Sequence, residues 1–173
     1  MRANCLKKGD TIGLISPSHV AEAEQYRPII SCLRSLGFPV KTGKNLYKNT
    51  VGYLASEQER ADDFNEMVAD PCVKLIFFGG GNGSIDLLPL IDYAQIIKNP
   101  KLFLSYSDGT SLLNAIYMKT GLITYYGQTP GNYAPPAVYT QKQFFSHLVD
   151  GAAENFVSNS QWHTLCGGVG GGI

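Results

Sequence analysis

Two short stretches of the chain combine residue types that could carry out acyl-transfer chemistry. The first, residues 105–109 (SYSDG), lies between an apolar run typical of a strand and an apolar run typical of a helix. A serine on such a turn presents its hydroxyl at a helix N-terminus, where backbone N–H groups favour a developing oxyanion. The small residues two before and two after Ser107, Ser105 and Gly109, resemble the flanks of a nucleophile elbow. Taken alone, the pattern favours a simpler interpretation in which Ser107 or a neighbour only caps the helix.

The second stretch is the glycine loop, residues 79–84 (GGGNGS), which follows the apolar run 73–78. Glycines let the backbone approach a ligand closely and turn its N–H groups inward as an anion-binding nest. The loop matches neither the dinucleotide-binding fingerprint nor the phosphate-binding P-loop. A tight strand-to-helix turn is the alternative interpretation. We expect both stretches to open on the same edge of a sheet. Their shared location supports an oxyanion pocket more strongly than either motif does alone.

A serine nucleophile also needs a base, which is usually a histidine oriented by a carboxylate. The chain has three histidines: His19, His147 and His163. His19 follows Ser-Pro-Ser in a loop that we expect on the favoured edge, so it could reach a site there. His147 lies among phenylalanines at helical spacing and is interpreted as a packing or surface residue. His163 cannot be placed, and the sequence shows no convincing catalytic triad.

The elements that must position these residues alternate along the chain. Strands are predicted at 11–16, 38–42, 73–78, 101–106 and 122–126, and helices at 24–36, from 56 onward, and at 84–97, 110–119 and 141–149. This alternation predicts an α/β fold with a mainly parallel sheet flanked by helices, flavodoxin-like or a related three-layer arrangement. Ligands of such folds bind at the carboxyl ends of the strands, which directs attention to loops 16–19, 79–84, 105–110 and 127–132.

The helix that begins after Ser56 carries several carboxylates. Ser56 with Glu59 three residues later forms a capping-box signature. Glu57, Glu59, Asp62 and Asp63 are interpreted together as a solvated helix face rather than as acid–base groups.

Composition excludes several classes of protein. The 173 residues carry 14 Lys and Arg against 14 Asp and Glu, which argues against a broad nucleic-acid surface. The apolar runs fall far short of the about 20 residues that a membrane-spanning helix needs. The four cysteines form no CxxC pair, so neither a zinc site nor a disulfide scaffold is expected. The N-terminal residues do not resemble a secretory signal, and we expect a cytoplasmic protein.

Four stretches in this order resemble the serine LD-carboxypeptidase family, which includes the microcin C immunity peptidases. They are Leu6–Ser18 (LKKGDTIGLISPS), Gly52–Phe78, Gly79–Tyr93 and Asn99–Gln128, which together span most of residues 6–130. The ordered set is far more specific than any one motif.

The resemblance implies that Ser107 is the nucleophile. It also implies that the backbone N–H of Asp108, with one from Gly80 or Gly81, forms the oxyanion hole. The implied reaction is hydrolysis of an amide in a murein tetrapeptide or in a microcin-type peptidyl nucleotide, without a metal or organic cofactor. Asn82 in the glycine loop is closer to the microcin-immunity branch. The expected partner is therefore a small peptide or peptidyl nucleotide, and the oligomeric state stays open, a homodimer included.

The chain departs from the family pattern at several positions. The family usually has glycine at Ser105, a β-branched residue at Gly109, and Gly-Pro where this chain has Gly127-Gln128. Its catalytic glutamate and histidine lie in a C-terminal domain, and none of the three histidines here matches that histidine.

The resemblance also bears on domain organisation. Residues 1–150 are expected to form the nucleophile-bearing α/β domain of a two-domain peptidase. Residues 151–173, of which five of the last seven are glycine, are expected to form a linker toward a C-terminal domain. The chain is predicted to be inactive without that domain. Two alternatives remain: a non-catalytic peptide-binding module and a truncated fragment.

Overall fold

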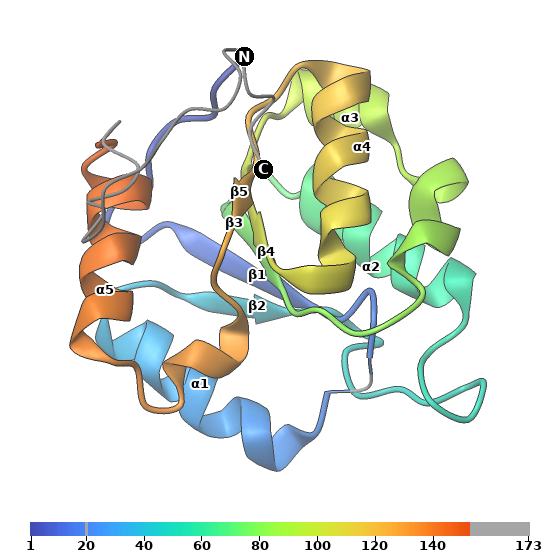
Figure 1. The fold of residues 1–173 in the computed structure, drawn as a ribbon, viewed down its shortest axis with the longest axis horizontal. Coiled ribbons are helices and arrows are strands. Elements are labelled where there is room, and N and C mark those ends of the chain that lie inside the picture. The colour runs from blue at the N-terminus through green and yellow to red at the C-terminus, as the bar shows by residue number, and fades with distance from the viewer. Residues whose placement is uncertain (20, 153–173) are drawn as a thin grey trace, which may run out of the picture.

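Five parallel strands form the centre of the fold (Figure 1). The computed structural model describes residues 1–19 and 21–152. The strands are β1 (Thr11–Ile15), β2 (Val40–Thr42), β3 (Val73–Phe78), β4 (Leu102–Ser105) and β5 (Tyr125–Tyr126), in the spatial order β2-β1-β3-β4-β5. This is the flavodoxin-like order. The predicted α/β class with a parallel sheet is confirmed.

Helices cover both faces of the sheet, as predicted for a three-layer fold. Figure 1 shows α1 (Ala23–Ser35) and α5 (Val138–Phe144) on one face, and α2 (Glu57–Ala69), α3 (Tyr93–Lys98) and α4 (Thr110–Thr120) on the other. Short 3-10 helices η1 (Ser84–Leu90), η2 (Ser107–Gly109) and η3 (Pro130–Tyr133) follow β3, β4 and β5, and α5 continues into the π-helical turn η4 (Phe145–Val149).

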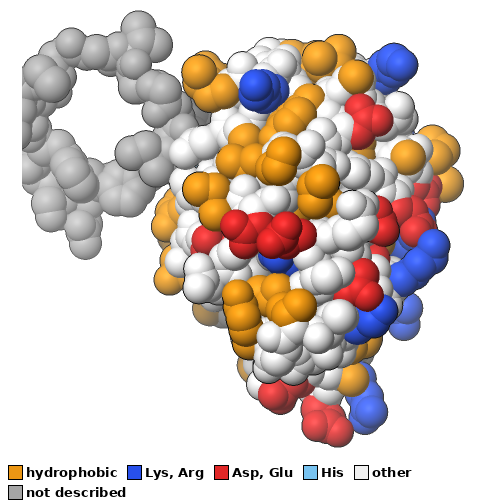
Figure 2. All heavy atoms as spheres, turned by 90° about the vertical axis from the view of Figure 1, so that its right-hand side faces the viewer, with side chains coloured by type: hydrophobic (Ala, Val, Ile, Leu, Met, Phe, Trp, Pro, Cys, Tyr) orange, Lys and Arg blue, Asp and Glu red, His pale blue; other side chains and the backbone are white. Residues whose placement is uncertain are grey.

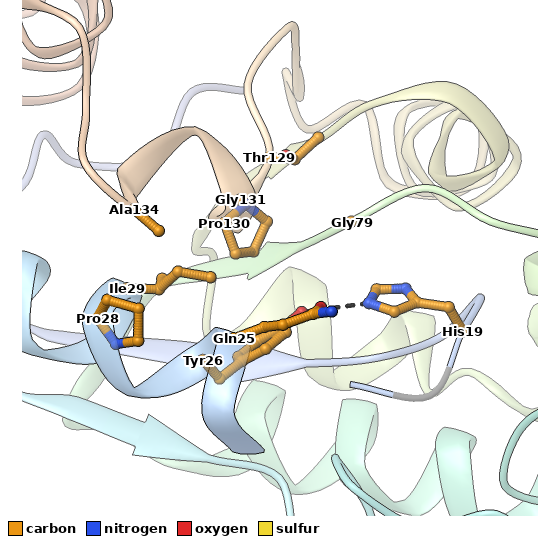
Figure 3. A pocket seen from close by; sticks show the side chains of 10 residues that line it. All are labelled: His19, Gln25, Tyr26, Pro28, Ile29, Gly79, Thr129, Pro130, Gly131 and Ala134. Atoms are coloured by element: carbon orange, nitrogen blue, oxygen red, sulfur yellow. Dashed lines mark hydrogen bonds between the residues drawn. The ribbon is translucent and has the colours of Figure 1, made fainter. Parts of the chain in front are cut away.

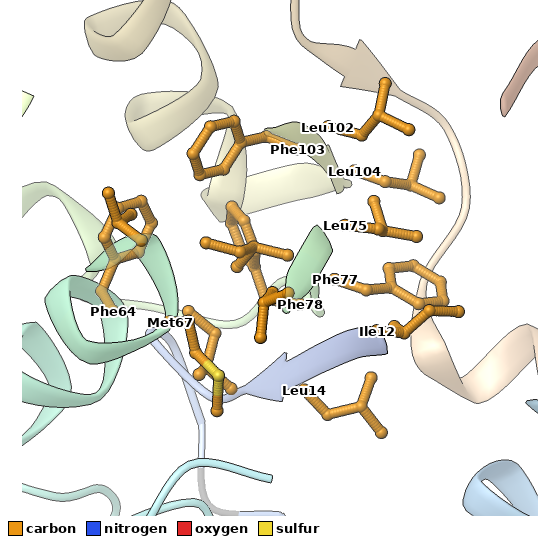
Figure 4. Close-up of a cluster of buried hydrophobic side chains, with 14 of the residues drawn as sticks. Ile12, Leu14, Phe64, Met67, Leu75, Phe77, Phe78, Leu102, Phe103 and Leu104 are labelled. Atoms are coloured by element: carbon orange, nitrogen blue, oxygen red, sulfur yellow. The ribbon is translucent and has the colours of Figure 1, made fainter. Parts of the chain in front are cut away.

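The central strands are buried on both sides because helices pack on each face. Along β3 every side chain except Lys74 is buried, which is typical of parallel strands covered on both sides. Successive side chains alternate between the two faces (Figure 4). Phe78 and Phe103 face α2, where both pack against Phe64, while Leu75, Phe77, Leu102 and Leu104 project from the opposite face.

Two elements differ from the sequence prediction. The single helix expected at 84–97 is divided into η1 and α3, because Pro89 lacks the N–H that an α-helix would need there. Asp92 then caps α3 by accepting a hydrogen bond from the N–H of Gln95 at 2.9 Å. The strand expected at 122–126 is reduced to β5, because the N–H of Ile123 pairs with the carbonyl of Met1 instead of with β4.

The carboxylate face of α2 is only partly solvated, so that prediction was wrong for Asp63. Asp62 and Glu57 are exposed, but Asp63 is 4% exposed. Its carboxylate accepts hydrogen bonds from the backbone N–H and the side-chain amide of Asn45, at 2.9 and 3.0 Å. Burial raises the pKa of Asp63, and these donors partly oppose the shift.

Charge is mixed on the face seen in Figure 2, where acidic and basic side chains are interspersed among apolar and neutral ones. Within residues 1–19 and 21–152, no helix has the length and apolar composition needed to cross a bilayer. His163 and all but the first two positions of the predicted linker lie outside the described residues.

Candidate active site

The loops singled out by sequence meet at the carboxyl edge of the sheet. β1 and β3 are neighbours at the point where the strand order reverses, which is the usual ligand crevice of doubly wound folds. Residues 16–19 leave β1 at this edge and residues 79–83 leave β3. The turn at 106–108 leaves the next strand, β4. The fold therefore brings the serine motif and the glycine loop together.

Ser107 has a strained backbone. It is the only non-glycine residue in the described part of the chain with a positive φ, +56°. Such a conformation costs about 1–3 kcal/mol and is found mainly where function requires it. The preceding residue, Tyr106, is extended and occupies the N-cap position of η2, with no side-chain capping bond. Ser107 is therefore not a helix cap, and its geometry is that of a sharp strand-to-helix elbow.

Gly80 packs directly against this elbow. A Cβ at position 80 would lie 2.7 Å from the Cβ of Ser107 and 2.9 Å from the carbonyl oxygen of Tyr106. Only glycine fits such a contact. Neither the N–H of Gly80 nor that of Asp108 donates a hydrogen bond to any residue within the described ranges. Two backbone donors near Ser107 are thus available to a ligand.

Gly81 meets a different neighbour. A Cβ there would lie 2.1 Å from the carbonyl oxygen of Ser18, and φ at Gly81 is +152°. The same carbonyl accepts the N–H of Asn82 at 2.8 Å. Gly81 thus seats the glycine loop on the loop after β1, whereas Gly80 is the glycine in contact with Ser107.

Asp108 fastens the elbow to the glycine loop from the other side. Its Oδ2 accepts the backbone N–H of Ser84 at 2.9 Å, and the Ser84 hydroxyl donates to the carbonyl oxygen of Asp108 at 2.6 Å. Burial alone would raise the pKa of Asp108, but the surrounding hydrogen-bond donors, those of Ser84 included, hold it below its usual value. The carboxylate thus anchors the glycine loop through Oδ2.

His19 lines a cavity beside the glycine loop (Figure 3). The cavity has a volume of about 470 Å³ and lies between α1, the loop after β1 and η3. The His19 ring lies against Gly79, whose added Cβ would be 2.9 Å from Cε1, and its Nε2 is 3.3 Å from the Tyr26 hydroxyl. Burial lowers the pKa of His19, an effect that the backbone of Gly80 partly opposes. His19 is therefore near the site but pairs with Tyr26 instead of Ser107.

His147 is engaged elsewhere. Its ring nitrogens lie 3.1 Å from the carbonyl oxygen of Ala152 and 3.0 Å from the side-chain oxygen of Gln143. It is a packing residue of η4, in agreement with its predicted role. Neither histidine in the described part of the chain hydrogen-bonds to Ser107.

Sequence reasoning missed Arg60, and it assigned no role of its own to Ser84, which ends the glycine loop; both residues shape this site. Arg60 is 4% exposed and donates to backbone carbonyls of both loops. No sequence signal marks it, because it lies among the charged residues of α2 and an arginine in such a stretch is ordinarily solvated. Ser84 followed a glycine run that already explained a turn, and only its pairing with Asp108 reveals its role.

An elbow serine at the carboxyl edge of a flavodoxin-like sheet, with a glycine loop against it, is typical of hydrolases that use a serine nucleophile. The chain belongs to the family described as LD-carboxypeptidase N-terminal domain, Peptidase_S66, which matches residues 12–127. The predicted family is therefore confirmed.

Particular relatives come from two branches of this family. The chain is 38% identical to the microcin C7 self-immunity protein MccF of Escherichia coli over 156 residues, 88% of this chain and 43% of that protein. It is 41% identical to the probable murein peptide carboxypeptidase of Bacillus subtilis over 128 residues, 73% of this chain and 40% of that protein. The structure of MccF in complex with aspartyl sulfamoyl adenosine superposes with a TM-score of 0.80 at 39% identity, covering 86% of this chain and 47% of that one. The chain thus spans less than half the length of these relatives.

Proposed function

We propose that this chain carries the nucleophile of a serine hydrolase of the LD-carboxypeptidase type, with Ser107 as the attacking residue. The observation that carries the proposal is the elbow itself: Ser107 has a positive φ between β4 and α4, and Gly80 packs on it. Strain of this kind at an ordinary turn would be relieved by a glycine or asparagine. A serine retained there is explained by the need to present its hydroxyl.

In the proposed reaction, the Oγ of Ser107 attacks the carbonyl carbon of a substrate amide. The electron pair of the C=O bond moves to oxygen, and the N–H groups of Asp108 and Gly80 stabilise the oxyanion. The C–N bond then breaks, the leaving amine takes the serine proton through a general base, and an acyl-enzyme remains. Water attacks this ester, releasing the acid and restoring the hydroxyl.

The base of this reaction is not among the residues that the structure describes. His19 is paired with Tyr26, and the carboxylate of Asp108 is held by Ser84. The resemblance to the family assigns base and orienting carboxylate to a histidine and a glutamate of a C-terminal domain. We therefore expect the chain alone to hydrolyse its substrate negligibly, because an unactivated serine hydroxyl is a weak nucleophile.

The proposed substrate is an amide of a murein tetrapeptide or a peptidyl nucleotide. A self-immunity protein and a murein peptide carboxypeptidase match with similar identity, 38% and 41%. Asn82 in the glycine loop favours the peptidyl nucleotide. Both substrates are small and water-soluble, so a cytoplasmic site of action is proposed with either.

A non-catalytic peptide-binding module is the second candidate. The observation that favours it is the cavity beside the glycine loop, about 470 Å³ and lined by polar His19, Gln25 and Tyr26. Such a cavity could hold a ligand whether or not a base reaches Ser107. A truncated fragment that neither binds nor reacts is the third.

One pair of measurements separates these candidates. The chain is joined to the C-terminal half of the E. coli relative, and both binding and hydrolysis of a peptidyl nucleotide and of a murein tetrapeptide are measured. The enzyme interpretation predicts that the joined protein hydrolyses substrate. Ser107→Ala should abolish hydrolysis but not binding, and the control Ser111→Ala, on α4, should leave hydrolysis intact. Binding without hydrolysis in the unchanged sequence would favour the module. Absence of both binding and hydrolysis would favour the fragment.

A further inference from the structure

We propose that Arg60 is a positioning residue that holds the glycine loop and the loop after β1 in register around Ser107. The inference rests on the proposed function. Arg60 lies in the first turn of α2 and is 4% exposed. Its Nη1 donates to the carbonyl oxygens of Pro17 and Gly83, at 2.5 and 2.8 Å, and its Nε donates to that of Ala55 at 2.9 Å. One guanidinium thus joins three separate segments of backbone.

The partners of Arg60 are unusual for a buried cation. Buried charges are ordinarily paired with an opposite charge, because an unpaired ion is costly to desolvate. Within the described residues no carboxylate lies within salt-bridge distance of Arg60, and the recorded acceptors are all backbone carbonyls. A planar guanidinium carries five donors on three nitrogens in a fixed fork, so it can reach carbonyls of three separate segments, whereas an ammonium donates from a single nitrogen and an apolar side chain cannot donate at all.

Both carbonyls held by Nη1 lie one residue from a contact that shapes the site. The residue after Pro17 is Ser18, whose carbonyl accepts the N–H of Asn82 and contacts Gly81. The residue after Gly83 is Ser84, whose N–H binds Asp108. Arg60 therefore holds the glycine loop next to its contact with Ser18 at one end and next to its contact with Asp108 at the other. Gly80, the proposed oxyanion donor, lies between these two points.

A second buried cation provides a matched control. Lys101 is 1% exposed, and its Nζ donates to the carbonyl oxygens of Asp70 and Val73, both at 2.6 Å. The Val73 carbonyl lies at the amino end of β3 and the Asp70 carbonyl at the end of α2 just before it, so both are opposite the site. Removing either cation leaves buried carbonyls unpaired and destabilises the fold. Only the loss of Arg60 should act on the loops around Ser107.

Amide hydrogen exchange of the 173-residue chain tests the inference without requiring activity. The N–H of Asn82 is hydrogen-bonded to Ser18 in the loop after β1, and that of Ser84 to Asp108 in the elbow, whereas the N–H of Ile76 in β3 reports global unfolding. In Arg60→Lys and Arg60→Met, exchange at Asn82 and Ser84 should accelerate roughly tenfold or more relative to Ile76. In Lys101→Met this ratio should stay unchanged, even where all amides exchange faster.

The outcomes decide the inference separately from the proposed function. If Arg60→Met does not fold, Arg60→Lys decides, since it keeps the charge and loses the fork. Equal acceleration of Asn82, Ser84 and Ile76 in Arg60→Lys would show a merely structural arginine and overturn the inference. That result would leave Ser107 as nucleophile untouched. Conversely, selective loosening of the loops supports the positioning role even if hydrolysis is never found.

Discussion

The hydroxyl of Ser105 fills the space that a side chain at Gly109 would need. A Cβ at position 109 would lie 2.0 Å from the Oγ of Ser105, which is fully buried and has no hydrogen-bond partner in the described part of the chain. The family usually has glycine at the first position and a β-branched residue at the second. The two departures therefore exchange side-chain volume beside the Ser107 elbow, where a Cβ at position 109 would also meet Phe78 Cε2 at 2.9 Å, and they leave the elbow intact.

This exchange predicts strong coupling between the two positions. Gly109→Val alone should lower the free energy of unfolding by about 1–3 kcal/mol, because the added atoms collide with Ser105. Ser105→Gly removes the nearest of the colliding atoms, while Phe78 Cε2 remains 2.9 Å from the added Cβ, so the double variant should recover part of that loss. Urea unfolding of all four proteins gives the coupling energy. Additive effects in the double variant would show that the two side chains do not share this space.

Gly80→Ala should disrupt the site more than the fold. The added Cβ would lie 2.7 Å from the Cβ of Ser107 and 2.9 Å from a carbonyl oxygen, so the loop must move away from the elbow. We expect hydrolysis by the protein joined to its C-terminal half to fall at least about 100-fold, as on loss of an oxyanion donor. Ser111→Ala, the control on α4 named above, should leave hydrolysis unchanged. Equal activity of the two variants would argue against close packing of Gly80 on Ser107.

His19 should make the fold sensitive to mild acid. Burial lowers the pKa of His19 in the folded chain, whereas the pKa of a histidine in the unfolded chain is about 6.5. As the pH falls below that value the unfolded state takes up the proton first, so the free energy of unfolding decreases. Urea unfolding between pH 7 and pH 5 should show this slope, and His19→Gln should flatten it. An unchanged slope in His19→Gln would mean that another group titrates there.

Adjacent carboxylates on α2 should differ in their effect on stability. Asp63→Ala leaves the backbone N–H of Asn45 unpaired and removes one of the two acceptors of its amide, the other being the Glu59 carbonyl, which should cost about 1–3 kcal/mol. Asp62 is exposed, and Asp62→Ala should change stability by no more than about 0.5 kcal/mol. Thermal or urea unfolding of the two variants measures the difference. Similar losses for both would contradict the assigned burial.

The sheet could be predicted because its strands are continuous apolar runs and its helices carry caps and periodic apolar faces. Ser107 and the glycine loop could be singled out because each lies between an apolar strand run and a helix run. Either pattern alone also fits a helix cap or a tight turn, and the resemblance of the ordered stretches to the family favoured a site. Arg60 and Asp63 could not be assigned from the sequence. Both lie in a polar stretch of α2, and their burial depends on loops that are distant in sequence, at Pro17, Asn45 and Gly83. A local sequence pattern cannot predict such long-range contacts.

The most direct test of the account is the site of acylation. The chain joined to the C-terminal half of the E. coli relative is mixed with substrate, quenched in acid, digested with trypsin and analysed by mass spectrometry. We predict that the substrate's acyl group is found on the peptide Leu102–Lys119, attached to Ser107, and that Ser107→Ala shows neither the adduct nor hydrolysis. Hydrolysis that persists in Ser107→Ala, or an adduct on another peptide, would contradict the assignment of Ser107 as the nucleophile.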